Sequence, residues 1–408
     1  MKAASAERVD QPKSTRETVA FLLDYAPKNW CSREDYHVRL CEALSAAGVR
    51  SVLVFAKQLP DELARALQQK GVHTATIDYG KGVFHYYREL GKLVRKYSVT
   101  AVHICYFDYF SAIAWMAHRH GVRTIIYEAV NSGFFSARSW KKALLNLRTQ
   151  LMTKPLTRVI AISDFVKRQL VDSGVSSEKI DVRHLGVDNK RCSPAPDARQ
   201  ALAKDYLIDK DEVVVSTVSF LNPFKNPHTI VEACGLLASE GVRFRLFVAG
   251  EGPLRTELES LSRRIGIAGR VHWLGHVGDP GRLLQGSDIF ALASVGEAFG
   301  LVLTEAMACG LPVVATQSGG IVEIVEDGET GFLVSALNSE AFAAALRRLI
   351  EDAHLREDMG DRGRARVAEM FTVNRVVSRT MEIYKSMNLV RGDSSTQENC
   401  SWEEGSSS

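Results

Sequence analysis

The sequence predicts an α/β protein of two domains, each built on a parallel β-sheet. Short apolar runs alternate with helical segments along most of the chain, a pattern typical of parallel sheets covered by helices on both faces. The length of 408 residues exceeds what one hydrophobic core usually supports. Near the middle of the chain, Ser193-Pro194-Ala195-Pro196-Asp197 has the composition of a linker.

The first domain is predicted over residues 17–195, after a disordered lead over residues 1–16. Its strands are apolar, β-branched runs bounded by turn residues, and its helices lie between them. The expected strands are 18–23, 51–55, 72–77, 100–105, 122–127, 157–162 and 180–183. The expected helices are a first one that ends near Ala47, followed by 61–70, 83–96, 110–120, 139–153 and 164–173.

The second domain is predicted over residues 196–372 and repeats the same alternation. Its expected strands are 212–218, 243–249, 270–274, 288–292, 312–316 and 331–334. A final helix is expected over 373–387, within a terminal segment 373–391. Residues 392–408 are rich in Ser, Glu and Gly, which predicts a disordered tail.

Composition and charge limit the class of protein. Hydrophobic residues make up 46% and charged residues 24%, as in soluble globular proteins. A net charge of +3 is too small to predict a nucleic-acid partner. The seven cysteines form no CxxC pair, which favours buried thiols in a reducing cytosol. With no apolar run of about 18 residues and no signal peptide, a cytoplasmic protein is expected.

One stretch carries the strongest chemical signal. The apolar strand around residues 288–292 leads into a loop with Glu297, and a helix that begins at Gly300 carries Glu305. The helix is stopped by Gly310-Leu311-Pro312. The two carboxylates therefore lie at a strand-to-helix crevice, where open α/β sheets bind ligands and where a helix N-terminus suits a phosphate.

This pattern resembles the donor-site signature of retaining glycosyltransferases of family 4. The resemblance rests on two Glu eight positions apart with Phe299-Gly300-Leu301 between them, and it continues to residue 334 through Gly319-Gly320. It implies the GT-B fold, in which two Rossmann-like domains face a central cleft and the terminal helix crosses back to the first domain. It also implies transfer of a hexosyl group, with retention, from a UDP- or GDP-sugar to an acceptor hydroxyl.

The resemblance assigns roles to individual residues. Glu305 would bind the ribose of the donor and Glu297 would face the transferred sugar, while Lys225 would neutralise the departing diphosphate. Backbone N–H groups of the loop and nearby turns would contact the donor. These donor-binding positions are Phe299, Gly300, Leu301, Gly250, Gly252, His276, Val277, Gly319 and Gly320. A side chain at position 300 is expected to push the ligand away. No cofactor and no metal are expected, because no metal-ligand spacing is found.

The sequence departs from the family pattern at three places. Phe220 stands where the family carries an Arg five residues before the lysine. Ser32 and Arg33 replace a Gly-Gly loop, so Arg33 either supplies the missing phosphate charge or is an exposed helix-start residue. The family's histidine after the fifth strand is absent, and Glu128 or Asn131 occupies its place on the sugar or acceptor side. His103 is expected to be a core histidine.

The acceptor is left open as a sugar, a lipid-linked molecule or a small molecule. Residues 138–154 form a basic amphipathic segment, which either lies on the inner face of an anionic membrane or packs on its own sheet. Synthesis of a polysaccharide, a glycolipid or a related glycoconjugate is expected. The alternatives are a non-catalytic protein that binds sugar nucleotides and an epimerase of the same architecture.

Overall fold

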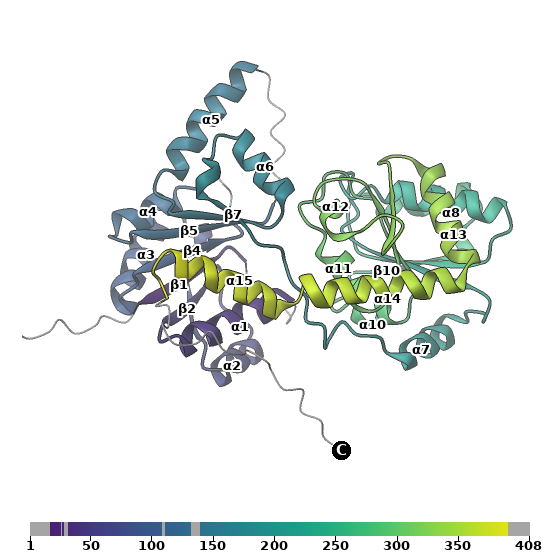
Figure 1. Ribbon diagram of the computed structural model, residues 1–408, viewed down its shortest axis with the longest axis horizontal. Helices are drawn as coiled ribbons and strands as arrows, with labels where there is room; N and C mark the ends of the chain where they lie inside the picture. The colour runs from purple at the N-terminus through teal and green to yellow at the C-terminus, as the bar shows by residue number, and fades with distance from the viewer. Residues whose placement is uncertain (1–16, 26, 28–31, 108–110, 132–138, 391–408) are drawn as a thin grey trace, which may run out of the picture.

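A computed structural model describes residues 17–25, 27, 32–107, 111–131 and 139–390, and two lobes lie side by side in it (Figure 1). Side chains at positions 32, 139–145 and 196 are outside the description. The predicted lead and tail also fall outside the described residues. The predicted fold class, α/β with two Rossmann-like parallel sheets, is confirmed.

The N-terminal lobe holds a seven-stranded parallel sheet in the order β3-β2-β1-β4-β5-β6-β7. Its central strand β1 is entirely buried, as its apolar sequence TVAFLL requires. The strands are β1 Thr18–Leu23, β2 Arg50–Phe55, β3 His73–Thr76, β4 Ala101–Cys105, β5 Thr124–Ala129, β6 Arg158–Ala161 and β7 Ile180–Val182. The helices are α1 Ser32–Ala46, α2 Asp61–Gln69, α3 Val83–Tyr97, α4 Ile113–Arg119, α5 Ser139–Thr153 and α6 Asp164–Asp172.

The C-terminal lobe holds a six-stranded parallel sheet in the order β10-β9-β8-β11-β12-β13. The strands are β8 Val213–Val218, β9 Phe244–Ala249, β10 Val271–Gly275, β11 Ile289–Leu292, β12 Val313–Thr316 and β13 Gly331–Val334. The helices are α7 Pro196–Tyr206, α8 Pro227–Ser239, α9 Arg255–Arg264, α10 Gly281–Gln285, α11 Leu301–Ala308, α12 Ile321–Ile324, α13 Ser339–Glu351 and α14 Ala353–Met370. Short 3₁₀ turns cover Tyr79–Lys81, Ser177–Lys179 and Ala268–Arg270.

Both sheets reverse their strand order beside the first strand of the lobe, between β1 and β4 and between β8 and β11. Open α/β sheets bind ligands at the carboxyl ends of the strands at such a point. The loop that carries Glu297 follows β11, and the loop that carries Lys225 follows β8, so strand order alone brings them to one edge.

Two local expectations are wrong. Pro196 was expected to lie in a linker, but it begins α7, because proline is well suited to the first helical position. Glu128 was expected to follow the fifth strand, but it lies inside β5 and is buried. The domain limits at residues 195 and 372 stay predictions about how the chain divides.

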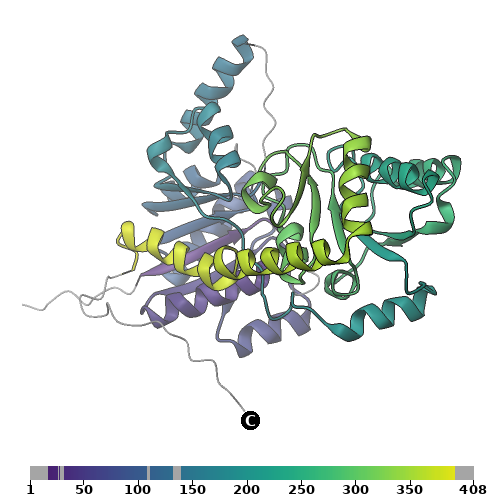
Figure 2. The same cartoon turned by 45° about the vertical axis from the view of Figure 1, so that its right-hand side comes forward.

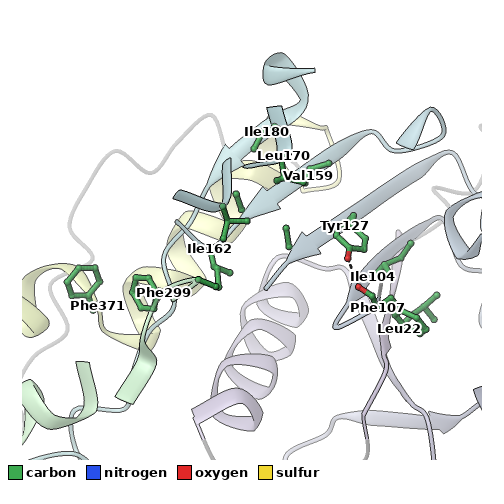
Figure 3. Close-up of a cluster of buried hydrophobic side chains, with 14 of the residues drawn as sticks. Leu22, Ile104, Phe107, Tyr127, Val159, Ile162, Leu170, Ile180, Phe299 and Phe371 are labelled. Atoms are coloured by element: carbon green, nitrogen blue, oxygen red, sulfur yellow. Dashed lines mark hydrogen bonds between the residues drawn. The ribbon is translucent and has the colours of Figure 1, made fainter. Parts of the chain in front are cut away.

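The last helix, α15 Val373–Ser386, leaves the C-terminal lobe and packs against α1 of the N-terminal lobe (Figures 1 and 2). Its Tyr384 is fully buried. The apolar core also continues from one lobe to the other, where Phe299 and Phe371 join the cluster that contains Ile162 (Figure 3). These contacts tie the two lobes together.

Two further observations concern the thiols and the membrane. The five cysteines in the described ranges are all buried and free, as expected. Burial raises the pKa of Cys234 to about 12, so this thiol stays protonated at neutral pH. Among the described helices, none combines the length and the apolar character needed to cross a bilayer.

Candidate active site

An ion pair between Lys225 and Glu297 lies at the shared edge of β8 and β11. The Lys225 ammonium donates a hydrogen bond to the Glu297 carboxylate across 72 residues of sequence. The backbone N–H of Lys225 donates to the side-chain oxygen of Asn222 at 2.9 Å, which fixes the loop. Both charged side chains keep some exposure, 24% and 13%, so a ligand at this edge can reach them.

The loop of Glu297 is held by its backbone. Gly320 donates its N–H to the Glu297 carbonyl at 2.7 Å, and the Ser318 hydroxyl accepts from the N–H of Gly296 at 2.5 Å. A Cβ atom at Gly319 would lie 2.0 Å from the Glu297 carbonyl oxygen. The glycine pair at 319 and 320 is therefore required by the close approach of two loops, and this approach positions Glu297.

Gly300 is the N-cap of the helix that carries Glu305. Its φ of +105° lies in the region that favours glycine, and an added Cβ would lie 3.1 Å from Cδ1 of Leu303. The backbone conformation is a sufficient reason for this glycine, and the expected clash of a side chain with a ligand stays a prediction. Leu301 is the first residue of α11, so free N–H groups of the helix start lie beside the Glu297 loop.

Glu305 lies one turn into α11 and is half-buried. Burial lowers the pKa of the Arg191 guanidinium, but the negative charge of Asp35, followed by Cys192 and Glu305, outweighs this effect, and the pKa rises above its ordinary value. Glu305 therefore lies in the field of a cation from the segment that joins the two lobes. The sequence did not indicate Arg191.

The Gly250 and Gly252 turn is packed against the loop after β8. A Cβ atom would lie 1.8 Å from the Ser219 carbonyl oxygen at Gly250, and 2.3 Å from that of Leu221 at Gly252. Gly250 also donates to the carbonyl of Gly275 at 2.7 Å, immediately before His276 and Val277. The predicted donor-side turns of β8, β9 and β10 are thus adjacent.

A group of contacts that we name the interdomain latch joins the lobes beside this site. The Glu323 carboxylate accepts hydrogen bonds from the backbone N–H groups of Asp164 and Phe165, both at 2.9 Å, and lies 3.0 Å from Nε2 of His184. The Ser163 hydroxyl donates to the Ala298 carbonyl at 2.6 Å. The latch therefore ties the N-terminus of α6 to the loop next to Glu297.

Glu323→Gln is expected to lower the free energy of unfolding by about 1.5–3 kcal/mol, because hydrogen bonds to a charged group are lost. Burial raises the pKa of Glu323, but the bonds from His184 and the two N–H groups outweigh it and hold the pKa below its usual value. Because the pKa of Glu323 is lower in the folded state than in the unfolded state, the ionised carboxylate stabilises the fold at pH values above the ordinary carboxyl range. This stabilisation is lost as the pH falls through the folded pKa. Urea unfolding of the variant and of wild type at pH 7 and at acidic pH measures this difference.

The matched control for the latch is Glu329→Gln, since Glu329 is well exposed and pairs only with a surface arginine in the described contacts. We expect it to change the unfolding free energy by less than about 0.5 kcal/mol. Equal stability of the Glu323 variant and this control at pH 7 would contradict the role of the latch.

A pocket of about 260 Å³ lies between the lobes, and it collects several predicted residues. Arg33 and Asn131 line it together with Leu301 from the other lobe. Ser32 is the first residue of α1, and its side chain lies outside the described part. The Arg33 guanidinium stacks on the Tyr25 ring, with its carbon 4.7 Å from the ring centre.

Glu128 also lines the pocket, but it does not project as a free cleft carboxylate. It forms an ion pair with Arg183, and both side chains are almost fully buried. Burial raises the pKa of Glu128, yet Arg183 and then His103 outweigh it, so the pKa lies far below its usual value. The sequence did not indicate Arg183, because it follows β7, two strands away from β5 in the sheet.

His103 is buried as expected, with Nδ1 2.6 Å from the Tyr384 hydroxyl. With Cys105 and Glu128 it forms a group whose potential ligand atoms lie within 4.8 Å of one another. Sequence spacing could not reveal this group, since it is formed by the pairing of β4 with β5. The Arg183 cation beside Glu128 opposes a divalent ion there by charge repulsion.

Two other predicted features lie at the surface. Phe220, in the position where the family carries an arginine, is 57% exposed. In α5, Leu147 and Leu151 are about half exposed, at 54% and 51%. The side chains of Trp140 and Leu144, on which the amphipathic pattern also rests, lie outside the described part.

Comparison with known proteins gives a family model for each half of the chain. Residues 34–191 match the family model "Glycosyltransferase Family 4", and residues 198–366 match "Glycosyl transferases group 1". A D-inositol 3-phosphate glycosyltransferase of Streptomyces avermitilis is 27% identical over 391 residues, which cover 86% of this chain and 82% of the relative. An N-acetyl-alpha-D-glucosaminyl L-malate synthase of Bacillus anthracis is 35% identical over 183 residues, 45% of this chain and 48% of the relative.

Solved structures share the fold at low sequence identity. HepE from Anabaena in complex with UDP and glucose has a TM-score of 0.76 at 20% identity and covers 91% of this chain and all of its own. WaaG, a glycosyltransferase involved in lipopolysaccharide biosynthesis, has a TM-score of 0.67 at 17% identity and covers 92% of this chain. The fold is thus GT-B. With two family models that follow one another along most of its length, the chain belongs to the group 1, family 4 glycosyltransferases.

Proposed function

We propose that this glycosyltransferase moves a hexosyl group from a nucleotide-diphospho-sugar to an acceptor hydroxyl with retention and without a metal ion. The observation that carries the proposal is the Lys225–Glu297 ion pair beside the N-terminus of α11. Two sources of positive charge, the ammonium and the helix start, adjoin one carboxylate there. A departing diphosphate needs such positive charge, and a sugar with a developing cation needs the carboxylate.

Each predicted residue has a role in this proposal. Lys225 stabilises the diphosphate, and Glu305 accepts hydrogen bonds from the ribose hydroxyls. Glu297 orients the sugar and stabilises positive charge at its anomeric carbon. The proton of the acceptor hydroxyl passes to the departing phosphate, so no strong protein base is required. Positive charge from Lys225 and α11 takes the place that a metal ion would otherwise have.

The relatives guide the choice of substrates. HepE binds UDP and glucose, which makes UDP-sugars the first donors to test, followed by GDP-sugars. Two kinds of relative are named after D-inositol 3-phosphate and L-malate, which are small molecules. WaaG acts in lipopolysaccharide biosynthesis, so a lipid-linked acceptor in polysaccharide or glycolipid synthesis is a second class.

The experiment is a screen of UDP-, GDP- and ADP-sugars for release of the nucleoside diphosphate, with and without EDTA. We expect one donor to be consumed and to raise the melting temperature. The anomeric configuration of the product, measured by NMR, reports retention. Inversion would overturn the stereochemical proposal, and loss of activity in EDTA would overturn metal independence.

A non-catalytic protein that binds sugar nucleotides is the alternative, and the exposed Phe220 favours it. Such a protein would be stabilised by a nucleotide sugar yet release no diphosphate during prolonged incubation. An epimerase of the same architecture would instead convert the sugar of the donor, which NMR of the recovered nucleotide sugar detects.

Phe220→Arg tests whether the lost phosphate cation limits donor binding. An added charge at this exposed position is expected to strengthen donor affinity about fivefold, since a solvated pair contributes about 1 kcal/mol. Titration of the nucleotide into wild type, Phe220→Arg and Phe220→Ala measures the effect. Equal gains in both variants would show that removal of the ring, and not the new charge, is responsible.

We also propose a cytoplasmic location, with peripheral contact at the inner membrane face through the segment 138–154. Half-exposed Leu147 and Leu151 in α5 support this contact. Co-sedimentation with anionic and with neutral liposomes tests it, and equal binding to both would contradict an electrostatic contact.

A further inference from the structure

The loop that carries Glu297 is held from the opposite lobe as well as from its own. The residue after Glu297 is Ala298, and its carbonyl accepts a hydrogen bond from the Ser163 hydroxyl at 2.6 Å. Ser163 is the N-cap of α6 in the N-terminal lobe, and it is fully buried. The bond fixes the loop at this point, because a buried carbonyl that loses its donor costs free energy.

The Ala298 carbonyl is also confined on the side of its own lobe. A Cβ atom added at Gly320 would lie 2.5 Å from the Ala298 carbonyl oxygen. The N–H of Gly320 donates to the preceding carbonyl, that of Glu297, at 2.7 Å. Two successive carbonyls of the loop are therefore held by different lobes, the first by Gly320 and the second by Ser163. A shift of the loop would break these bonds or bring it against Gly320.

A second contact from the N-terminal lobe lies on the ring of Phe299. The ring of His184, in the segment after β7, stacks on it with ring centres 5.5 Å apart and planes 26° apart. Phe371 lies edge-on to both rings, and Figure 3 shows it beside Phe299. Such aromatic pairs stabilise a structure beyond the area that they bury. His184 thus fixes the residue two positions after Glu297.

The interdomain latch sets the orientation of the His184 ring. Its Nε2 lies 3.0 Å from the Glu323 carboxylate, which also accepts the backbone N–H of Phe165 at 2.9 Å. Glu323 belongs to the short helix α12, whose N-cap is Gly320. One carboxylate therefore connects the ring on Phe299, the start of α6 and the turn that holds the Glu297 carbonyl.

Ser163 and His184 are placed to act on the reaction through the loop. Neither residue lines the pocket between the lobes. Their contacts with the loop are made at Ala298 and Phe299, directly after Glu297. A catalytic group must be held within about 0.5 Å of its productive position, and a displacement of about 1 Å can lower the rate about 100-fold.

We propose that Ser163 and His184 are positioning residues for sugar transfer, which hold the Glu297 carboxylate in place from the opposite lobe. A motion that separates the lobes would break both contacts, so the position of Glu297 is coupled to the contact between the lobes. The assignment rests on the proposed function, in which Glu297 stabilises charge on the sugar. Glu305 lies farther along, on α11, so nucleotide binding depends less on the position of the loop.

Four variants test the proposal in the full chain. Ser163→Ala removes the hydroxyl, and His184→Ala removes the ring. His184→Phe keeps a ring on Phe299 and removes the hydrogen-bonding nitrogen. The control is Asn338→Ala, because Ser163 also caps α6 with its side chain and Asn338 caps α13 in the same way, far from the loop in sequence.

Two quantities are measured well below the lowest melting temperature of the set. They are kcat at saturating donor and the dissociation constant of the nucleoside diphosphate. We expect Ser163→Ala and His184→Ala to lower kcat about tenfold or more, while the dissociation constant stays within about twofold of wild type. His184→Phe should lose less than His184→Ala, and Asn338→Ala should keep the wild-type kcat.

A double variant shows whether Ser163 acts through Glu297. Ser163→Ala is combined with Glu297→Gln, and the residual rate is followed at raised enzyme concentration. Residues that act as one unit are not additive, so the second substitution should add less than about twofold to the loss. A full further loss, as large as in the wild-type background, would overturn the proposal.

The other outcomes are equally decisive. A wild-type kcat in either alanine variant would overturn the role of that residue, and parallel losses of kcat and diphosphate affinity would overturn the assignment to Glu297. If Ser163→Ala does not fold, His184→Ala decides by the same criteria, since the His184 side chain is 26% exposed. A wild-type protein that consumes no nucleotide sugar would instead refute the proposed function itself.

Discussion

Lys225→Ala is expected to lower the rate of sugar transfer about 100- to 1000-fold, the usual loss when one preorganised group at a developing charge is removed. The ammonium lies against Glu297 at the edge of the sheet, so its removal takes away the cation nearest to the proposed diphosphate. It also leaves the Glu297 carboxylate without its partner, and the negative charge of this carboxylate then repels the leaving group. Initial rates of diphosphate release at saturating donor measure the effect.

Three further variants show whether the loss of rate is due to the Lys225 charge. Lys210→Ala removes an exposed lysine of the same lobe and should keep the wild-type rate. Lys225→Arg keeps the charge and should lose less activity than Lys225→Ala. Glu297→Gln removes the carboxylate but leaves the lysine in place, so it separates the effect of the carboxylate from the effect of the cation. If Lys225→Ala keeps more than a third of the wild-type rate, the ion pair does not carry the chemistry.

Glu128→Gln is expected to lower the free energy of unfolding by about 3–5 kcal/mol, as the loss of one partner of a buried ion pair does. Arg183 would then be a buried cation, at 1% exposure, without a counter-charge. The depressed pKa of Glu128 means that the pair stabilises the fold at all pH values above the ordinary carboxyl range and is lost only in strong acid. Chemical unfolding at pH 7 measures the loss.

The double variant Glu128→Gln with Arg183→Gln is the matched control. It removes both charges, so it should be more stable than Glu128→Gln alone. The difference in unfolding free energy measures the cost of burying the unpaired Arg183 cation. A loss of less than about 1 kcal/mol in the single variant would show that water or another group compensates Arg183.

The local pattern of the chain predicted the elements well and the site in part. Strands such as β1 and β11 were predicted because buried parallel strands are short apolar runs between turns. Glu128 was misplaced for the same reason, since a charged residue normally ends such a run, and Arg183 together with His103 makes its burial tolerable. Gly300 was identified, but its positive φ could not be read from its neighbours.

By itself the sequence determined the alternation of strands and helices and the class of transferase, and it predicted the donor-side residues. It could do so because the stretch from Glu297 to Glu305 and the glycines after it are contiguous, and contiguous residues form one strand–loop–helix unit. The tertiary structure alone decided which distant groups face one another. Lys225 meets Glu297, Glu323 meets the start of α6, and Arg183 meets Glu128. These contacts depend on strand order and on how the lobes pack, and neither is encoded in local periodicity.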